Sequence, residues 1–163
     1  MEVLRQTGFL RIRVLGESML PGIWPGDLIT IKRQPAETFA IGDIGLFNRS
    51  DRFFAHRIEK IVTILGSLHF ITRGDSVSDN DPSFHQAELL GKVVAIQRNG
   101  QTRVPAWPQP LYALIAGWIL CHCNRLRSLS LRVHALYGLR THREFGGKNA
   151  QHGNFAGLSS PAK

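Results

Sequence analysis

The chain has 163 residues, of which 43% are hydrophobic and 20% charged, and its formal net charge at pH 7 is +8. This length corresponds to about one domain, and the composition is that of a folded globular protein, which excludes a fully disordered or fibrous chain. The two cysteines, Cys121 and Cys123, are too close in sequence to cross-link a fold, so they do not identify a redox compartment.

The N-terminal residues do not have the pattern of a signal peptide. Arg5, Arg11 and Arg13 interrupt any apolar run before it reaches the length that such a region needs. We also expect no transmembrane helix ahead of Ser18, since such a helix requires about 20 apolar residues.

Residues 1–103 have the pattern of short strands separated by Gly, Pro and Asp turns. The composition predicts connectors at Thr38–Ile41 and Ser83–Leu90. Six strands at this spacing predict a mainly β domain, either an antiparallel barrel or a sandwich. The predicted strands are Phe9–Val14, Asp27–Arg33, Asp43–Phe47, Phe53–Ile64, Leu68–Thr72 and Lys92–Gln97.

Residues 104–145 have a different character and predict a linker followed by helices. Three prolines form a stiff linker, and Leu111–Cys123 then carries no charge. As a helix this run would be roughly 20 Å long, shorter than the ~30 Å core of a bilayer. Apolar residues next recur at helical spacing beside arginines, which predicts an amphipathic basic helix that contains Leu126, Leu129, Val133 and Leu136.

Most of the net positive charge lies in residues 104–163. Residues 104–163 contain seven Lys or Arg and one acidic residue, Glu144, whereas residues 1–103 are nearly neutral. Such a segment attracts anionic lipid or nucleic acid. We expect residues 146–163, which are rich in Gly, Ser, Asn and Gln, to be a disordered tail.

One serine lies in a segment that predicts a tight turn. Gly16 and Pro21 bracket Ser18 in the sequence GESMLP, and Gly26-Asp27 follows. A serine becomes a nucleophile when a turn presents its hydroxyl to a base and a nearby backbone N–H can hold an oxyanion. Taken alone, Ser18 is either such a nucleophile or an ordinary turn residue.

A histidine lies inside a strand-like apolar run, in the sequence AHRI. Histidine is the side chain best suited to accept a serine proton near neutral pH. His56 is therefore a candidate base, and its alternative role is that of a partly buried structural residue. Arg57 should point to the opposite face of the strand.

An acidic segment, ITRGDSVSDNDP, ends a predicted strand and enters a turn. A buried carboxylate that accepts from the second imidazole nitrogen fixes the tautomer of a catalytic histidine. Asp75, Asp79 and Asp81 are all candidates, although Asx-rich turns also form because these side chains cap their own backbone. The spacing does not fit a calcium loop, which also needs a glutamate at its twelfth position.

Together and in this order, the three segments resemble the boxes of the type I signal peptidase family, over residues 12–98. GESMLPGIWPGD resembles its nucleophile box, and ITRGDSVSDNDP resembles its Gly-Asp box. FAHRIEKI resembles the base box of the endoplasmic-reticulum and archaeal branch, where histidine replaces the lysine of most bacterial enzymes. The resemblance implies a signal-peptidase-like β barrel or sandwich, here with a C-terminal helical extension, and residues 1–103 as the catalytic domain.

The resemblance also implies roles for individual residues. Ser18 would be the nucleophile, His56 the general base and Asp81 the orienting aspartate, while Asp75 would shape the site or share the orienting role. The Ser18 backbone N–H would form part of the oxyanion hole, and a second donor must come from elsewhere because Gly16 lacks the hydroxyl that some relatives place there. No metal and no organic cofactor is implied.

The implied activity is that of a serine endopeptidase that cleaves signal-peptide-like segments of exported precursor proteins after small residues. Members of the family usually carry an N-terminal transmembrane anchor, so we expect residues 104–145 to attach this chain peripherally or weakly to a membrane surface, on a side that the sequence does not define. The alternative for this segment is a surface helix packed on the catalytic domain.

Two other functions are compatible with parts of the sequence. A self-cleaving repressor-type peptidase would normally pair its serine with lysine and carry an N-terminal helix-turn-helix, and neither is expected here. A non-catalytic basic module could bind membrane or nucleic acid, but aromatic residues are not interleaved with the charges, so we expect no specific nucleic-acid partner.

Overall fold

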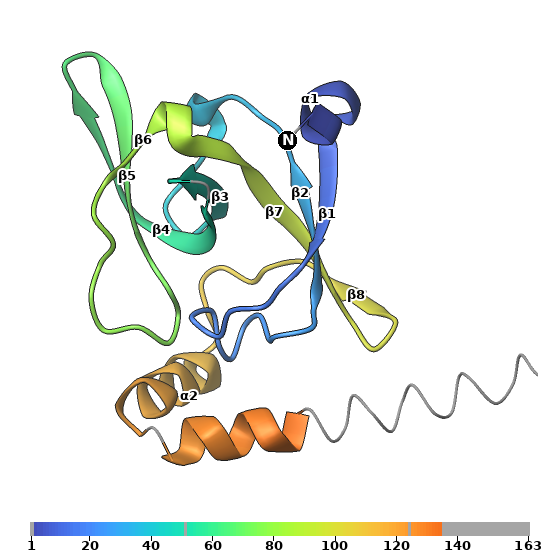
Figure 1. Cartoon of the computed structure of the whole chain (residues 1–163). Helices are drawn as coiled ribbons and strands as arrows, with labels where there is room; N and C mark the ends of the chain where they lie inside the picture. The colour runs from blue at the N-terminus through green and yellow to red at the C-terminus, as the bar shows by residue number, and fades with distance from the viewer. Residues whose placement is uncertain (1, 51, 124, 135–163) are drawn as a thin grey trace, which may run out of the picture. The chain divides into compact units, whose positions relative to one another are not determined.

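The computed structural model describes residues 2–50, 52–123 and 125–134. Within these residues the fold is mainly β, with a single antiparallel sheet and helices at the C-terminal end (Figure 1). The predicted tail, residues 146–163, and the end of the predicted basic helix at Leu136 lie outside the described residues.

The sheet has eight strands and is not closed into a barrel. The strand order is β1-β2-β7-β3-β4-β5-β6, and β8 pairs with β7 beside this path. The prediction of a mainly β antiparallel domain with a helical extension is confirmed. The prediction of a closed barrel is wrong, because β1 and β6, the two ends of the strand order, do not pair with each other. The strands are β1 (Phe9–Arg13), β2 (Leu28–Lys32), β3 (Ile44–Arg49), β4 (Arg52–Ile64), β5 (Ser67–Arg73), β6 (Phe84–His85), β7 (Leu89–Arg98) and β8 (Gln101–Arg103).

The helical elements are short, apart from those at the C-terminal end. They are α1 (Glu2–Thr7), two 3-10 turns, η1 (Ala36–Thr38) and η2 (Gln86–Glu88), and α2 (Leu111–His122). Residues 125–134 are also helical. None of the helices in the described part of the chain is long and apolar enough to cross a membrane.

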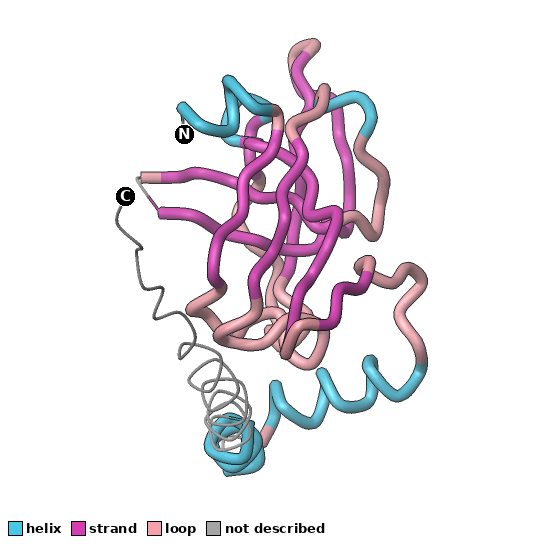
Figure 2. The backbone as a smooth tube through the Cα atoms, turned by 90° about the vertical axis from the view of Figure 1, so that its right-hand side faces the viewer, coloured by secondary structure: helices cyan, strands magenta, loops and turns pink. Residues whose placement is uncertain are grey.

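The described residues up to Leu126 form one compact unit that includes the sheet and α2, and residues 127–134 belong to a second unit. In the first unit the sheet is strongly curved, and several loops gather at one end of it next to α2 (Figure 2). In the second unit, residues 127–134 are described and are helical.

The core has an aliphatic part and an aromatic part on either side of the central strand β3. Strand β3 pairs with β4 on one edge and β7 on the other, and Ile44, Leu46 and Phe47 are almost fully buried. β-Branched and aromatic residues at alternating positions favour strands because their side chains pack on a half-buried pleated surface. The aliphatic cluster includes Ile29, Ile31 and Val93, and the aromatic cluster contains Phe39, Phe47, Ile58, Phe70 and Phe84.

Strand β4 changes partners along its length, and this places the candidate site. Its first half pairs with β3, where His56 lies opposite Gly45. Strand β5 pairs with β4 only from Arg57 onward, through the pair Arg57 and Arg73. The loop that follows β5 therefore lies beside the part of β4 that carries His56.

Candidate active site

The turn that carries Ser18 is held by buried side chains on its C-terminal side. Met19, Leu20 and Ile23 are each at most 3% exposed, whereas Ser18 is half-buried. The Ile23 N–H donates to the Met19 carbonyl over 2.8 Å, which closes the turn. Burial of its neighbours thus fixes the position of Ser18 while leaving its side chain at the surface.

His56 lies within hydrogen-bond distance of the serine. Its Nε2 is 2.9 Å from Ser18 Oγ, and the residue is 8% exposed. The Phe54 ring lies edge-on to the imidazole, with ring centroids 6.2 Å apart. Ser18 and His56 are 38 positions apart in sequence.

Asp81 lies on the other side of the imidazole ring. Its Oδ2 is 2.5 Å from His56 Nδ1 and accepts a hydrogen bond from the Thr72 hydroxyl over 2.6 Å. The Asp81 backbone N–H donates to the Thr72 carbonyl over 2.8 Å. Thr72 is fully buried at the end of β5, so it fixes both the backbone and the carboxylate of Asp81.

The Asp81 carboxyl has a pKa below its ordinary value of 3.8. Burial raises this pKa, but hydrogen bonds from His56 and Thr72, together with the charge of Arg49, lower it and prevail. A carboxylate can only accept hydrogen bonds, so His56 Nδ1 carries the proton and Nε2 is left to accept one from the Ser18 hydroxyl. This arrangement has the polarity that a nucleophilic serine requires.

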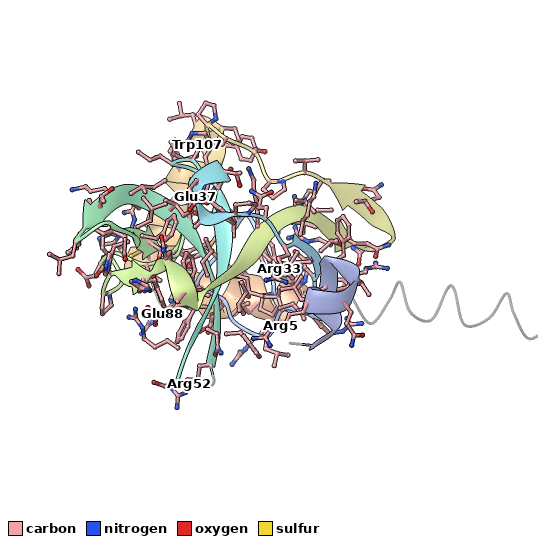
Figure 3. The ribbon with its side chains drawn as sticks, turned by 90° about the horizontal axis from the view of Figure 1, so that it is seen from above. Arg5, Arg33, Glu37, Arg52, Glu88 and Trp107 are labelled. Atoms are coloured by element: carbon pink, nitrogen blue, oxygen red, sulfur yellow. The ribbon has the colours of Figure 1, made fainter. Side chains whose placement is uncertain are left out.

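A guanidinium holds the segment that follows Asp81. Arg49, at the end of β3, donates to the Ser83 carbonyl over 2.6 Å and to the two carboxylate oxygens of Glu88 over 2.6 and 2.8 Å. The same guanidinium lies 3.9 Å from the centre of the Phe84 ring. Glu88 has a lowered pKa, chiefly because of its hydrogen bonds with Arg49. Figure 3 labels Glu88.

Asp75 does not touch His56. Its two carboxylate oxygens accept hydrogen bonds from Arg57 Nε and Nη2 over 2.8 and 2.9 Å, and both side chains are about 95% buried. Arg57 also donates to the Gly42 carbonyl over 2.7 Å. Because alternate residues of a strand point to opposite faces, β4 directs His56 toward Ser18 and Arg57 toward Asp75.

The loop that contains Asp75 nevertheless contacts the serine segment directly. The Ser76 N–H donates to the Ser18 carbonyl and the Ser76 hydroxyl donates to the Glu17 carbonyl, each over 2.9 Å. A Cβ on Gly74 would lie 2.6 Å from the Ser18 carbonyl oxygen and 2.9 Å from Ser18 Cβ. The Gly-Asp segment therefore positions the backbone of Ser18.

The structure thus brings together Ser18, His56 and Asp81, and it places Asp75 in a separate ion pair that adjoins them. The third sequence candidate, Asp79, is exposed and accepts a hydrogen bond from Ser78. Among the described residues, no group of three or more His, Cys, Asp or Glu side chains is placed to hold a metal ion.

Several supporting residues were not identified from the sequence. Thr72 could have been predicted, because it follows Leu68 and Phe70 at the alternating positions of the strand that face the core, and its side chain is polar. Arg49 and Glu88 are 39 positions apart and give no local signal. The same is true of Arg98, which forms two hydrogen bonds, over 2.7 and 2.6 Å, with Asp27 at the end of the nucleophile segment.

A cavity of about 390 Å³ lies on the Arg57 side of β4 rather than at the serine. It is lined by β4 and β5, the Asp75 loop, the linker and α2, including Arg73, Trp107, Leu114 and Trp118. Trp107 is 53% exposed and lies at the edge of the molecule in Figure 3.

A comparison of the chain with protein-family models gives no match, and neither does a comparison with curated proteins.

Proposed function

We propose that the protein is a serine endopeptidase that resembles the histidine-base branch of the type I signal peptidases. The observation that supports this proposal is the continuous hydrogen-bond chain from Ser18 Oγ through the His56 ring to Asp81, with spacings of 2.9 and 2.5 Å. The order of the three sequence boxes, which resemble those of this family, gives the same assignment by an independent route.

In the proposed reaction, Ser18 Oγ attacks the scissile carbonyl while His56 Nε2 takes its proton. His56 then returns that proton to the leaving amine, and water hydrolyses the acyl-enzyme with the same histidine as base. Asp81 keeps the imidazole in the required tautomer and stabilises the imidazolium that forms. The Ser18 backbone N–H would hold the developing oxyanion.

The substrate would bind as an extended segment along a sheet edge. β5 does not pair with β4 before Arg57, so the stretch around Phe54 and Ala55 has β3 as its ladder partner. Residues 14–17, ahead of Ser18, belong to no helix or strand, and Leu15 there is 87% exposed. Main-chain pairing with such an edge provides affinity, and shallow pockets select the side chains. The proposed substrate class is an exported precursor with small residues before the scissile bond.

We also propose that α2 attaches the chain peripherally to a membrane surface. The helix carries no charge, and the five large apolar side chains between residues 112 and 119 are 36% to 75% exposed: Tyr112, Leu114, Ile115, Trp118 and Ile119. Apolar patches of this kind mark interaction surfaces in soluble proteins. Arg125, Arg127 and Arg132 follow in sequence, and basic residues next to an apolar helix favour anionic lipid.

A cleavage assay tests the proposed activity. Purified protein should cleave a peptide that has Ala-x-Ala before the scissile bond, and a fluorophosphonate should label Ser18 covalently. The Ser18→Ala variant should lose both reactions and retain the wild-type circular dichroism spectrum. Cleavage that persists in this folded variant would remove Ser18 from the mechanism.

A further inference from the structure

We propose that α2 is a positioning element for Ser18, because its contact with the Asp75 loop sets the reactivity of the serine. We call this contact, which α2 makes through its buried residues Gly117 and Leu120, the seat of the helix. The inference rests on the proposed serine-peptidase function and adds to it a means by which the C-terminal extension regulates the site.

The contact between helix and loop depends on a glycine. A Cβ on Gly117 would lie 2.8 Å from the Asp75 carbonyl oxygen and 3.8 Å from the Leu20 carbonyl oxygen. Real Cβ atoms essentially never approach a backbone atom within 3.0 Å. Gly117 therefore lets the α2 backbone approach the Asp75 loop and the nucleophile turn at the same point.

The opposite side of the same loop holds the nucleophile. Ser76 donates hydrogen bonds to the carbonyl groups of Ser18 and Glu17. Gly74 packs against Ser18 and leaves no room for a Cβ. Three consecutive residues, 74–76, thus separate α2 from the backbone of Ser18. A displacement of the loop by a few tenths of an ångström would change the 2.9 Å contact between Ser18 Oγ and His56 Nε2.

The loop is fixed from within by the buried pair of Arg57 and Asp75, and the linker covers that pair. The Arg57 guanidinium lies 5.5 Å from the Trp107 ring centre, and Trp107 packs so closely on Gly42 that a Cβ there would meet the indole at 2.1 Å. The linker and α2 therefore contact the same support of the nucleophile from two sides.

The seat of α2 is small, which makes its position adjustable. Of the residues of α2, Gly117 and Leu120 are buried, and the cavity of about 390 Å³ adjoins the helix. Tyr112, Ile115 and Ile119 are exposed and do not line this cavity. A surface that binds this exposed side, such as a lipid bilayer, can therefore shift or secure the helix at little cost in packing.

The test compares Gly117→Ala with Leu111→Ala, in the absence of lipid. Alanine favours a helix over glycine, so any loss in Gly117→Ala comes from the seat and not from the helix itself. Leu111 is 71% exposed and belongs to neither the seat nor the site, which makes it the matched control. Two quantities are measured. One is the kinetics of labelling by a fluorophosphonate, and the other is the hydrogen exchange of the Ser76 amide, which donates a hydrogen bond to the Ser18 carbonyl.

We expect Gly117→Ala to lower the maximal labelling rate about tenfold, with the half-saturating probe concentration unchanged. We also expect exchange at Ser76 to increase while the amides of β3 keep their wild-type protection. Leu111→Ala should match the wild type in both measurements. If Gly117→Ala does not fold, Leu120→Ala, which empties the seat without a clash, should give the same two changes.

Wild-type exchange at Ser76 in the folded seat variants would overturn the inference, as would an unchanged labelling rate. The exchange measurement does not depend on catalysis. If the wild-type protein is neither labelled nor active on peptides, the proposed function fails, and faster exchange at Ser76 still shows that α2 supports the Ser18 segment.

Discussion

At the scale of single residues, the hydrogen bonds of His56 decide the direction in which a proton can move. Asp81 accepts from Nδ1, and Thr72 supplies a second hydrogen bond to the same carboxylate oxygen. Both interactions favour the ionised carboxylate, which would in turn favour the imidazolium that forms in the proposed reaction. The effect of each partner can be separated by substitutions that preserve shape.

Asp81→Asn should lower kcat by about 10³–10⁴-fold, because an amide can donate to Nδ1 and leave the Nε2 proton directed at Ser18. Thr72→Val removes one hydrogen bond from the carboxylate and should lower kcat less than tenfold. Steady-state cleavage of the Ala-x-Ala peptide measures both. Equal effects of the two substitutions would contradict the role assigned to Asp81.

The lowered pKa of Asp81 also predicts how stability depends on pH. A carboxyl whose pKa is lower in the folded than in the unfolded state stabilises the fold above the unfolded-state pKa of about 4, and this contribution is lost as the pH falls through the folded-state pKa. The difference in unfolding free energy between wild type and Asp81→Asn should thus diminish as the pH falls below about 4. Denaturant titrations at each pH measure it, and a difference that widens below pH 4 would refute the prediction.

Glu88 provides a check on that interpretation. Its pKa is also lowered, mainly by hydrogen bonds with Arg49, so its contribution is lost in the same direction on acidification. The Asp81→Asn variant should therefore retain part of the pH dependence of stability. That remainder should decrease in a variant that also carries Glu88→Gln.

The sequence predicts some residues of the site and not others. Ser18, His56 and Asp81 each lie in a short segment with its own pattern, and their order suffices to group them. The partners Arg49 and Arg57 are single basic residues in strands, where most such residues are solvated. Their acidic partners are 39 and 18 positions away, so only the fold reveals the pairs.

At the scale of elements, the Gly74–Ser76 segment links the sheet to Ser18. Gly74 and Gly16 lie near Ser18 in space or in sequence, but their surroundings differ. A Cβ on Gly74 would meet Ser18 within 3.0 Å, whereas a Cβ on Gly16 would meet nothing within 4 Å. Neither residue has a positive φ, so steric contact alone distinguishes them.

Gly74→Ala should lower kcat at least tenfold, since either the loop or the Ser18 backbone must move to admit the methyl group. Gly16→Ala adds the same methyl group in open space and should keep wild-type activity. Thermal unfolding of both variants would separate a local effect on Ser18 from a general loss of stability. Wild-type activity in Gly74→Ala would show that the segment does not position Ser18.

The elements themselves were predictable where their pattern was long. The six predicted strands correspond to β1, β2, β3, β4, β5 and β7, each within a few residues at its ends. Strands β6 and β8 have two and three residues and no alternation of their own, so pairing with a neighbour defines them. Register shifts in β2, β3 and β4 likewise arise from packing between strands.

At the scale of the whole molecule, the antiparallel sheet brings three distant segments to one place. The serine turn follows β1, His56 lies in β4, and Asp81 follows β5. The strand order puts β7 and β3 between β2 and β4, which no local pattern encodes. The number and spacing of the strands left a barrel or a sandwich open, and the sheet is not closed into a barrel, since closure depends on how its edges meet.

The exposed face of α2 predicts that the chain binds vesicles. Each large apolar side chain removed from water contributes roughly 1.5–3 kcal/mol when fully buried, so five of them can outweigh the loss of translational freedom on binding. The wild-type protein should sediment with vesicles that contain phosphatidylglycerol. Its tryptophan emission should shift to shorter wavelength as Trp118 enters the interface.

A double variant, Trp118→Ser with Ile119→Ser, should weaken this binding at least tenfold, because it removes two of the five side chains. Leu65→Ser is the matched control, since Leu65 is fully exposed at the turn between β4 and β5 and lies outside the helix. Added salt should weaken binding further, because Arg125, Arg127 and Arg132 contribute through the anionic headgroups, whose attraction is screened. Equal sedimentation of the double variant and the control would mean that α2 does not form the attachment surface.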